Sequence, residues 1–133
     1  MEKKKLLKHI VIFSIIFASF HKIALELSLY FTTWWSDMLM HTFGGVLGAL
    51  LVLYVTMLIG IKPQKLSRKI LLFLFVVVSV IAVGAIWELW EIFVGFTDPF
   101  TDIVDTISDL VMDTIGALIG FIYYEKRIRT KSE

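Results

Sequence analysis

The sequence contains four apolar runs, each close to the length that crosses a lipid bilayer. They extend over about residues 6–31, 37–61, 69–94 and 103–124. A helix needs about 20 residues to cross the hydrocarbon core of a membrane, which is about 30 Å thick. The chain has 133 residues, 58% of them hydrophobic, and a soluble domain of this size cannot bury so much apolar surface. The sequence therefore predicts an all-α integral membrane protein, in which residues 1–133 form one transmembrane four-helix bundle.

Basic residues mark three segments of the chain. Twelve of the thirteen Lys and Arg residues lie at the N-terminus, between the second and third runs, or at the C-terminus. An even number of spans places these segments on one side, and the positive-inside rule identifies that side as the cytoplasm. We expect a multi-pass protein of the cytoplasmic membrane with both termini in the cytoplasm. Contact with membrane lipids explains the basic clusters, so we expect no nucleic-acid partner.

The second and fourth runs carry the same pattern of polar residues. DMLMHTFGGVLGA at residues 37–49 is repeated as DLVMDTIGALIGF at residues 109–121. Asp37 aligns with Asp109, and His41 aligns with Asp113. We interpret this pattern as the duplication of a helical hairpin. Because the second and fourth helices run in the same direction, the repeat is parallel, with a pseudo-two-fold axis along the membrane normal.

Glycines follow the polar positions on the same faces of both repeated segments. Residues three or four apart share one face of a helix. Glycines at such spacing allow another backbone to approach closely. We therefore predict that the second and fourth helices pack through Gly44, Gly45, Gly48, Gly116 and Gly120.

This packing brings ionisable side chains together about one to two turns below the outer surface. A charge at that depth costs at least about 2.5 to 3.5 kcal/mol unless it is paired, coordinated or protonated. Carboxylates and a histidine on facing helices are typical of metal sites in helical bundles. We predict a divalent metal site formed by Asp37, His41, Asp109 and Asp113. The ligand types admit zinc, manganese, iron, magnesium or calcium.

Two further groups of polar residues lie near this depth. The WELWE motif of the third run carries Glu88 and Glu91, which are candidates for a catalytic general base. The first run carries His21, Lys22 and Glu26, which are possible additional site residues. Lys22 and Glu26 are four residues apart and can pair with each other, and Lys22 can also extend to the outer interface.

The motifs of the second to fourth runs resemble a known family. DxxxHxxGG at residues 37–45, WExxE at 87–91 and DxxxDxxGA at 109–117 are similar to the YjdF-like small membrane proteins. A more distant similarity is to VanZ-like proteins, in which an asparagine is expected near the position of Asp113. Neither resemblance implies a particular reaction.

Three classes of function are compatible with a polar cluster of this kind. The first is a metal-dependent enzyme that acts on a lipid or lipid-linked headgroup. The sequence shows no Ser, Cys or Lys nucleophile with an evident activating base, which favours metal-activated water over covalent chemistry. The second is a cation or proton transporter or channel, which requires a polar path across the membrane. The third is a structural or accessory protein in which a network of carboxyl groups and histidine holds the helices together, with or without homo-oligomerisation. We rank cation binding first, with an enzyme ahead of a transporter.

Overall fold

The computed structural model describes residues 2–61, 65–95, 98 and 102–129, and these residues form helices and no strands. The elements are α1 (Glu2–Glu26), α2 (Leu29–Thr32), α3 (Trp34–Leu58), α4 (Leu66–Val94), α5 (Ile103–Tyr123) and the π-helical segment η1 (Tyr124–Arg129). Four helical stretches are long and apolar enough to cross a membrane: Glu2–Glu26, Trp34–Leu58, Leu66–Val94 and Ile103–Arg129. The prediction of an all-helical chain with four candidate spans is therefore confirmed. Lys62 and Lys131, which we assigned to the basic segments, lie outside the described residues.

The connection between the first two spans differs from the predicted one. We expected the first helix to continue to residue 31, but α1 ends at Glu26 because Ser28 has a left-handed backbone with φ of 54°. The short helix α2 follows, and α3 begins at Trp34 instead of at residue 37. The Ser36 hydroxyl lies within hydrogen-bond distance of the carbonyl oxygens of Leu29, at 2.8 Å, and Thr33, at 2.7 Å. Its single hydrogen is shared between these two acceptors, and the contacts link the two sides of the chain reversal.

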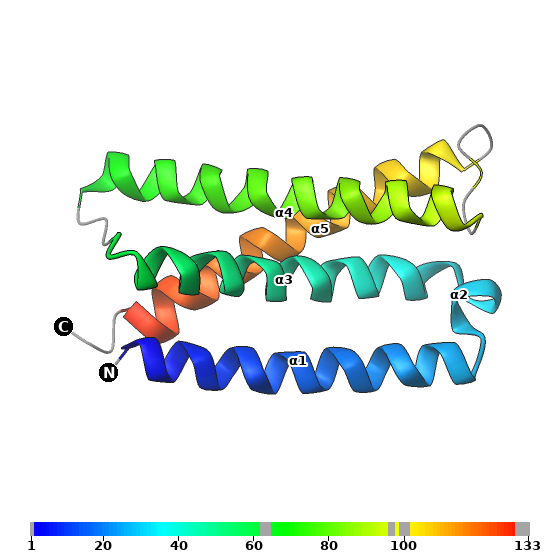
Figure 1. The fold of residues 1–133 in the computed structure, drawn as a ribbon, viewed down its shortest axis with the longest axis horizontal. Coiled ribbons are helices and arrows are strands. Elements are labelled where there is room, and N and C mark those ends of the chain that lie inside the picture. Colours follow the sequence, from blue (N-terminus) through cyan, green and yellow to red (C-terminus); the bar gives the residue numbers. More distant parts are fainter. Residues whose placement is uncertain (1, 62–64, 96–97, 99–101, 130–133) are drawn as a thin grey trace.

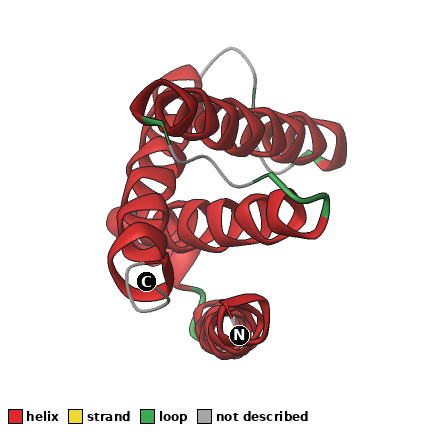
Figure 2. Ribbon diagram, turned by 90° about the vertical axis from the view of Figure 1, so that its left-hand side faces the viewer, coloured by secondary structure: helices red, strands yellow, loops and turns green. Residues whose placement is uncertain are grey.

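Helix α3 lies at the centre of the bundle and contacts each of the other α-helices. Its most extensive contact is with α5, which crosses it obliquely and runs in the same direction (Figure 1). Figure 2 shows α1 beside α3, on the side away from α4. The start of α1 and the end of η1 lie at the same end of the bundle, where the Lys5 ammonium donates a hydrogen bond to the Arg127 carbonyl oxygen.

The apolar core occupies the half of the bundle near these ends of the chain. Its buried members come from every long helix and include Leu6, Leu50, Leu53, Val76 and Ile128. Many large apolar side chains on the outer faces are exposed, as is expected for helices in contact with hydrocarbon. The opposite half, where α3 begins and α4 ends, contains the buried acidic residues.

The contact between α3 and α5 depends on glycines from both helices. A Cβ atom built on Gly45 would lie closer than 3.0 Å to the Asp113 carbonyl oxygen. A Cβ on Gly116 would lie 2.9 Å from the Gly45 Cα, and one on Gly120 would lie 2.9 Å from the Ala49 Cβ. No side chain fits at these positions without moving a backbone. The two segments that we interpret as repeats therefore pack closely against each other.

Two of the predicted packing glycines have other surroundings. A Cβ on Gly44 would meet only ordinary contacts, with Phe17 Cε2 on α1 at 3.9 Å and with Asp113 Oδ1 on α5 at 4.0 Å. A Cβ on Gly48 would lie 3.3 Å from Val80 Cγ2, so Gly48 faces α4. The register of the helices therefore places Gly45, rather than Gly44, at the closest approach of the α3 and α5 backbones.

We expect Gly45→Ala to destabilise the bundle by about 1–3 kcal/mol, because the added methyl group forces α5 away from α3. Alanine is otherwise the better helix former, so a loss of stability isolates the steric effect. The free energy of unfolding in detergent, measured by titration with a denaturing detergent, checks this expectation. Gly44→Ala is the matched control and should change stability by less than about 0.5 kcal/mol. Equal effects of the two substitutions would contradict the observed helix packing.

Candidate metal centre

His41 on α3 lies among four carboxylates from three helices. Its Nε2 atom is 3.8 Å from Asp37 Oδ1, 3.7 Å from Glu88 Oε1 and 4.0 Å from Asp109 Oδ2. Its Nδ1 atom is 3.4 Å from Asp113 Oδ2. The structure thus brings together all four predicted metal ligands and one of the two predicted catalytic glutamates.

Helical spacing and helix packing together explain this arrangement. Asp37 and His41 are four residues apart on α3, and Asp109 and Asp113 have the same spacing on α5, so each pair shares one helix face. The glycine contact between α3 and α5 turns these faces toward each other. Glu88 enters from α4, which contacts both helices.

Three carboxylate oxygen atoms in the cluster are buried without a hydrogen-bond partner among the described residues. They are Glu88 Oε1, Asp109 Oδ1 and Asp113 Oδ2, in side chains that are 5%, 2% and 7% exposed. A buried carboxylate oxygen without a partner is unfavourable by more than about 1–3 kcal/mol. One imidazole cannot balance four carboxylates, even when it is protonated. The cluster therefore requires bound cations or protons.

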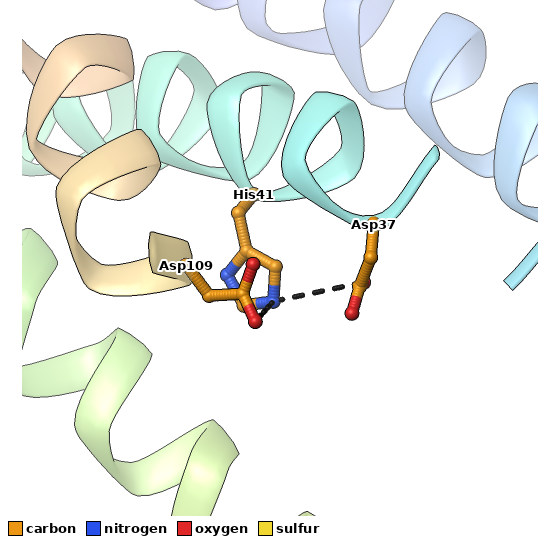
Figure 3. Close-up of side chains that lie close together, drawn as sticks. All are labelled: Asp37, His41 and Asp109. Atoms are coloured by element: carbon orange, nitrogen blue, oxygen red, sulfur yellow. Dashed lines mark ion pairs between the residues drawn. The ribbon is translucent and has the colours of Figure 1, made fainter. Parts of the chain in front are cut away.

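Asp37, His41 and Asp109 lie close enough together to be candidate ligands of one metal ion. Each offers one nitrogen or oxygen atom, and these atoms all lie within 4.8 Å of one another (Figure 3). Donor atoms that bind one ion at about 2.0–2.5 Å are separated by about 3–4 Å. Imidazole nitrogen and carboxylate oxygen are ligands of zinc, manganese and iron in proteins.

Asp113 has a different position from the other three carboxylates. It faces Nδ1, whereas Asp37, Glu88 and Asp109 face Nε2 on the other side of the imidazole ring. One ion therefore cannot bind both His41 Nε2 and the Asp113 oxygen that faces Nδ1. This separation was not part of the sequence prediction, which assigned the four residues to a single ligand set.

Gly84 on α4 makes room for the Asp113 carboxylate. A Cβ built on Gly84 would overlap Asp113 Oδ2 and would lie 3.2 Å from Leu110 Cδ2. Gly84 lies one helical turn before Glu88, on the same face of α4. The sequence signal was a single glycine one turn before the WELWE motif, and our sequence analysis did not identify it.

Glu91, the second predicted catalytic glutamate, is not among the carboxylates that pair with His41 in the described part of the chain. Its Oε1 accepts a hydrogen bond of 2.9 Å from the Trp87 indole nitrogen, and the side chain is partly exposed. Glu88 and Glu91 therefore have different surroundings, although they are only three residues apart.

The three candidates from the first helix also lie apart from the cluster. Lys22 Nζ is 3.7 Å from Glu26 Oε1, and the two side chains are 75% and 65% exposed. His21 Nδ1 is 2.7 Å from the Tyr30 hydroxyl. Burial, together with the carboxylates of Asp37 and Glu91, raises the pKa of Tyr30 to about 12. The phenol therefore stays protonated at neutral pH, and the direction of its hydrogen bond with His21 depends on the tautomer of the imidazole.

The cluster is accessible mainly from the side of Asp37. The Asp37 side chain is 30% exposed, whereas that of His41 is 8% exposed. Asp37 lies in the first turn of α3, beside the exposed Trp34 and Trp35. Tryptophans of this kind are enriched at the interface between membrane and water. A ligand that reaches the cluster would therefore approach from the end of the bundle where α3 begins.

A family model described as "Predicted membrane protein (DUF2238)" matches residues 2–130. Neither a curated protein nor a solved structure matches the chain at a significant level.

We expect Gly84→Ala to displace the Asp113 carboxylate from His41 Nδ1 and to destabilise the protein by about 1–3 kcal/mol. A double-mutant cycle with Asp113→Ala, based on free energies of unfolding in detergent, tests this expectation. The penalty of Gly84→Ala should largely disappear when the carboxylate is absent. A penalty of unchanged size in the Asp113→Ala background would show that Gly84 serves only the packing of α4 and α5.

Proposed function

The chain belongs to the family of predicted membrane proteins described as DUF2238, which is the family of the YjdF-like proteins, and we propose that it binds a divalent cation between α3, α4 and α5. The observation that carries this proposal is the convergence of four carboxylates on one buried imidazole. Three of their oxygen atoms are buried and have no hydrogen-bond partner within the described part of the chain. A divalent cation bound by Asp37, His41 and Asp109 would reduce the excess negative charge of the cluster. The similarity to VanZ-like proteins stays a prediction.

Three residues would hold the ion, and a fourth would orient the histidine. Asp37, Asp109 and His41 Nε2 are the ligands in this proposal. A metal-binding histidine commonly donates its other N–H group to a carboxylate, which fixes the ring and strengthens the ligand. Asp113 has the position for that role, 3.4 Å from Nδ1. The sequence prediction is thereby refined, since Asp113 supports the site without binding the ion.

The ligand set favours some metals over others. Calcium and magnesium prefer oxygen ligands, whereas imidazole suits zinc, manganese and iron. The two carboxylates of the ligand set balance the charge of one divalent ion. Three protein ligands leave further coordination positions for water or a substrate, as in catalytic metal sites. We therefore place zinc, manganese and iron ahead of magnesium and calcium.

We expect the protein purified in detergent to contain about one equivalent of a divalent metal, as such three-ligand sites do. Elemental analysis measures this content, and His41→Ala and Asp109→Asn should each lose the metal. Asp113→Asn should retain the site with an affinity that is lower by about 10–100-fold, as is usual when an orienting carboxylate is removed. Competition with a chelator of known affinity measures that difference.

Glu26→Gln is the matched control for these variants, because it removes a carboxylate that is exposed and paired with Lys22. Its metal content should equal that of the unmodified protein. The proposal would be overturned if the unmodified protein contained no bound metal even after incubation with zinc, manganese and iron. Loss of metal in Glu26→Gln would show that general negative charge, and not the cluster, retains the ion.

Glu88 supports a catalytic use of the site as a metal-dependent enzyme. Its Oε1 lies 3.7 Å from His41 Nε2, the nitrogen that faces the proposed ligands, and has no hydrogen-bond partner among the described residues. A bound metal lowers the pKa of a coordinated water molecule, and a nearby carboxylate can accept its proton. Glu91, the alternative base, is hydrogen-bonded to Trp87, so we assign the general base to Glu88.

The position of the cluster indicates a substrate at the membrane interface. Its accessible side lies at the end of the spans, where Trp34 and Trp35 are exposed. We therefore propose that the cluster hydrolyses an ester or phosphate ester in a lipid or lipid-linked headgroup. The charge pattern predicts that this end faces the outer side of the cytoplasmic membrane.

A transporter is the second hypothesis, and the core gives it less support. The cluster is followed along α3 by Val46, Ala49, Leu50 and Leu53, which are buried. Gly45 and Gly116 leave no space between α3 and α5 at the start of this region. A cation path needs polar groups or water along its length, and this region is apolar and closely packed. The structural function, without metal, is the third hypothesis.

We expect Glu88→Gln to retain the metal while turnover falls by at least about 100-fold, as is usual for loss of a general base. The measurement is headgroup release from phospholipid vesicles containing the protein, together with hydrolysis of nitrophenyl phosphate esters. Glu26→Gln should leave the rate unchanged. Absence of turnover in the metal-loaded protein would remove this class of reaction and leave cation binding intact. A loss of metal in Glu88→Gln would instead identify Glu88 as a ligand.

A further inference from the structure

A groove lies between α3 and α4 at the end opposite the acidic cluster. It has a volume of about 480 Å³, within the range of about 300–1,000 Å³ that is common for small-molecule sites. Four apolar side chains line it together with Thr56, Gly60 and Arg68; these apolar side chains are Ile61, Leu71, Leu72 and Phe75. The described lining residues therefore form an apolar surface with one cationic side chain, that of Arg68.

The backbone on the α3 side of the groove is held in a defined turn. Gly60 has a φ of 84°, which ends the helix. The Ile61 amide donates to the Thr56 carbonyl oxygen at 2.9 Å, and the Gly60 amide donates to that of Met57 at 3.3 Å. These bonds satisfy backbone groups at the end of α3, so the turn does not need a ligand to complete it. The α3 side of the groove is thus defined by backbone hydrogen bonds of the described residues.

Arg68 and Lys69 are adjacent in sequence but have different surroundings. Lys69 Nζ is 3.8 Å from Glu125 Oε2, whereas no carboxylate of the described residues pairs with Arg68. Arg68 lines the groove in the first turn of α4, and Leu71, Leu72 and Phe75 follow it toward the centre of the span. The positive charge therefore lies at the membrane surface, and the apolar lining extends about 10 Å inward.

This order of groups matches an anionic phospholipid. A guanidinium group binds phosphate with two parallel hydrogen bonds, and basic pockets between transmembrane helices bind the headgroups of acidic lipids. We propose that the α3–α4 groove is a binding site for an anionic phospholipid, with its phosphate on Arg68 and one acyl chain along Leu71 and Phe75. The site is independent of the cation site, since the two lie at opposite ends of the spans.

Native mass spectrometry of the full chain in detergent tests the lipid site. The probes are phosphatidylglycerol and phosphatidylcholine with identical acyl chains. We expect the protein to retain phosphatidylglycerol about fivefold more strongly, as one basic side chain at a membrane surface provides. Arg68→Gln should abolish this preference, and Arg68→Lys should keep most of it.

Lys8→Gln is the matched control, because it removes one positive charge from the exposed surface of α1 at the same end of the bundle. It should leave the preference unchanged. Equal losses in Arg68→Gln and Lys8→Gln would overturn the proposal in favour of general attraction between basic residues and acidic lipids. Equal retention of the two lipids by the unmodified protein would also overturn it.

Discussion

The close contact between α3 and α5 is the interaction on which the polar site depends. Gly45 and Gly116 allow the two backbones to meet at a distance that any side chain would prevent. Helix association in a bilayer lacks the hydrophobic effect that drives it in water, so close packing of small residues contributes much of its stability. The same contact turns His41 toward Asp113, with 3.4 Å between Nδ1 and Oδ2. The polar site therefore forms only when α3 and α5 pack together.

The two aligned segments are similar in sequence but differ in chemistry at their meeting point. His41 and Asp113 occupy corresponding positions, and they contact each other across the interface between the segments. Two aspartates at these positions would repel each other, because like carboxylates in close contact cannot both stay ionised. With a histidine in one segment, the imidazole of His41 instead pairs with the carboxylate of Asp113. It also leaves Nε2 for the three other carboxylates, so the difference between the segments creates the candidate metal site.

Helical periodicity explains which parts of this structure could be predicted. Spacing along one helix assigns residues to a face, so the spans and the grouping of Asp37, His41, Asp109 and Asp113 followed from the sequence. Contacts between helices depend also on rotation about each axis and on the crossing angle. The sequence therefore did not distinguish Gly45 from Gly44 or identify the space at Gly84.

The end of α1 at Glu26 could not be predicted either. It depends on the left-handed backbone of Ser28, a conformation that is usually signalled by a glycine. The separation of Lys22, Glu26 and His21 from His41 follows from the position of α1 at the edge of the bundle.

The two halves of the bundle have opposite effects on its stability. Each buried carboxylate oxygen without a hydrogen-bond partner is unfavourable by about 1–3 kcal/mol or more, and three of them approach the net stability of about 5–15 kcal/mol that is usual for a folded protein. The apolar half, with Leu50, Leu53 and Val76 at its centre, must therefore offset the acidic half. A ligand that binds only the folded state adds stability in proportion to the logarithm of its concentration. Cation binding would consequently stabilise the acidic half, which packing alone stabilises least. The free energy of unfolding would then depend on the cation concentration.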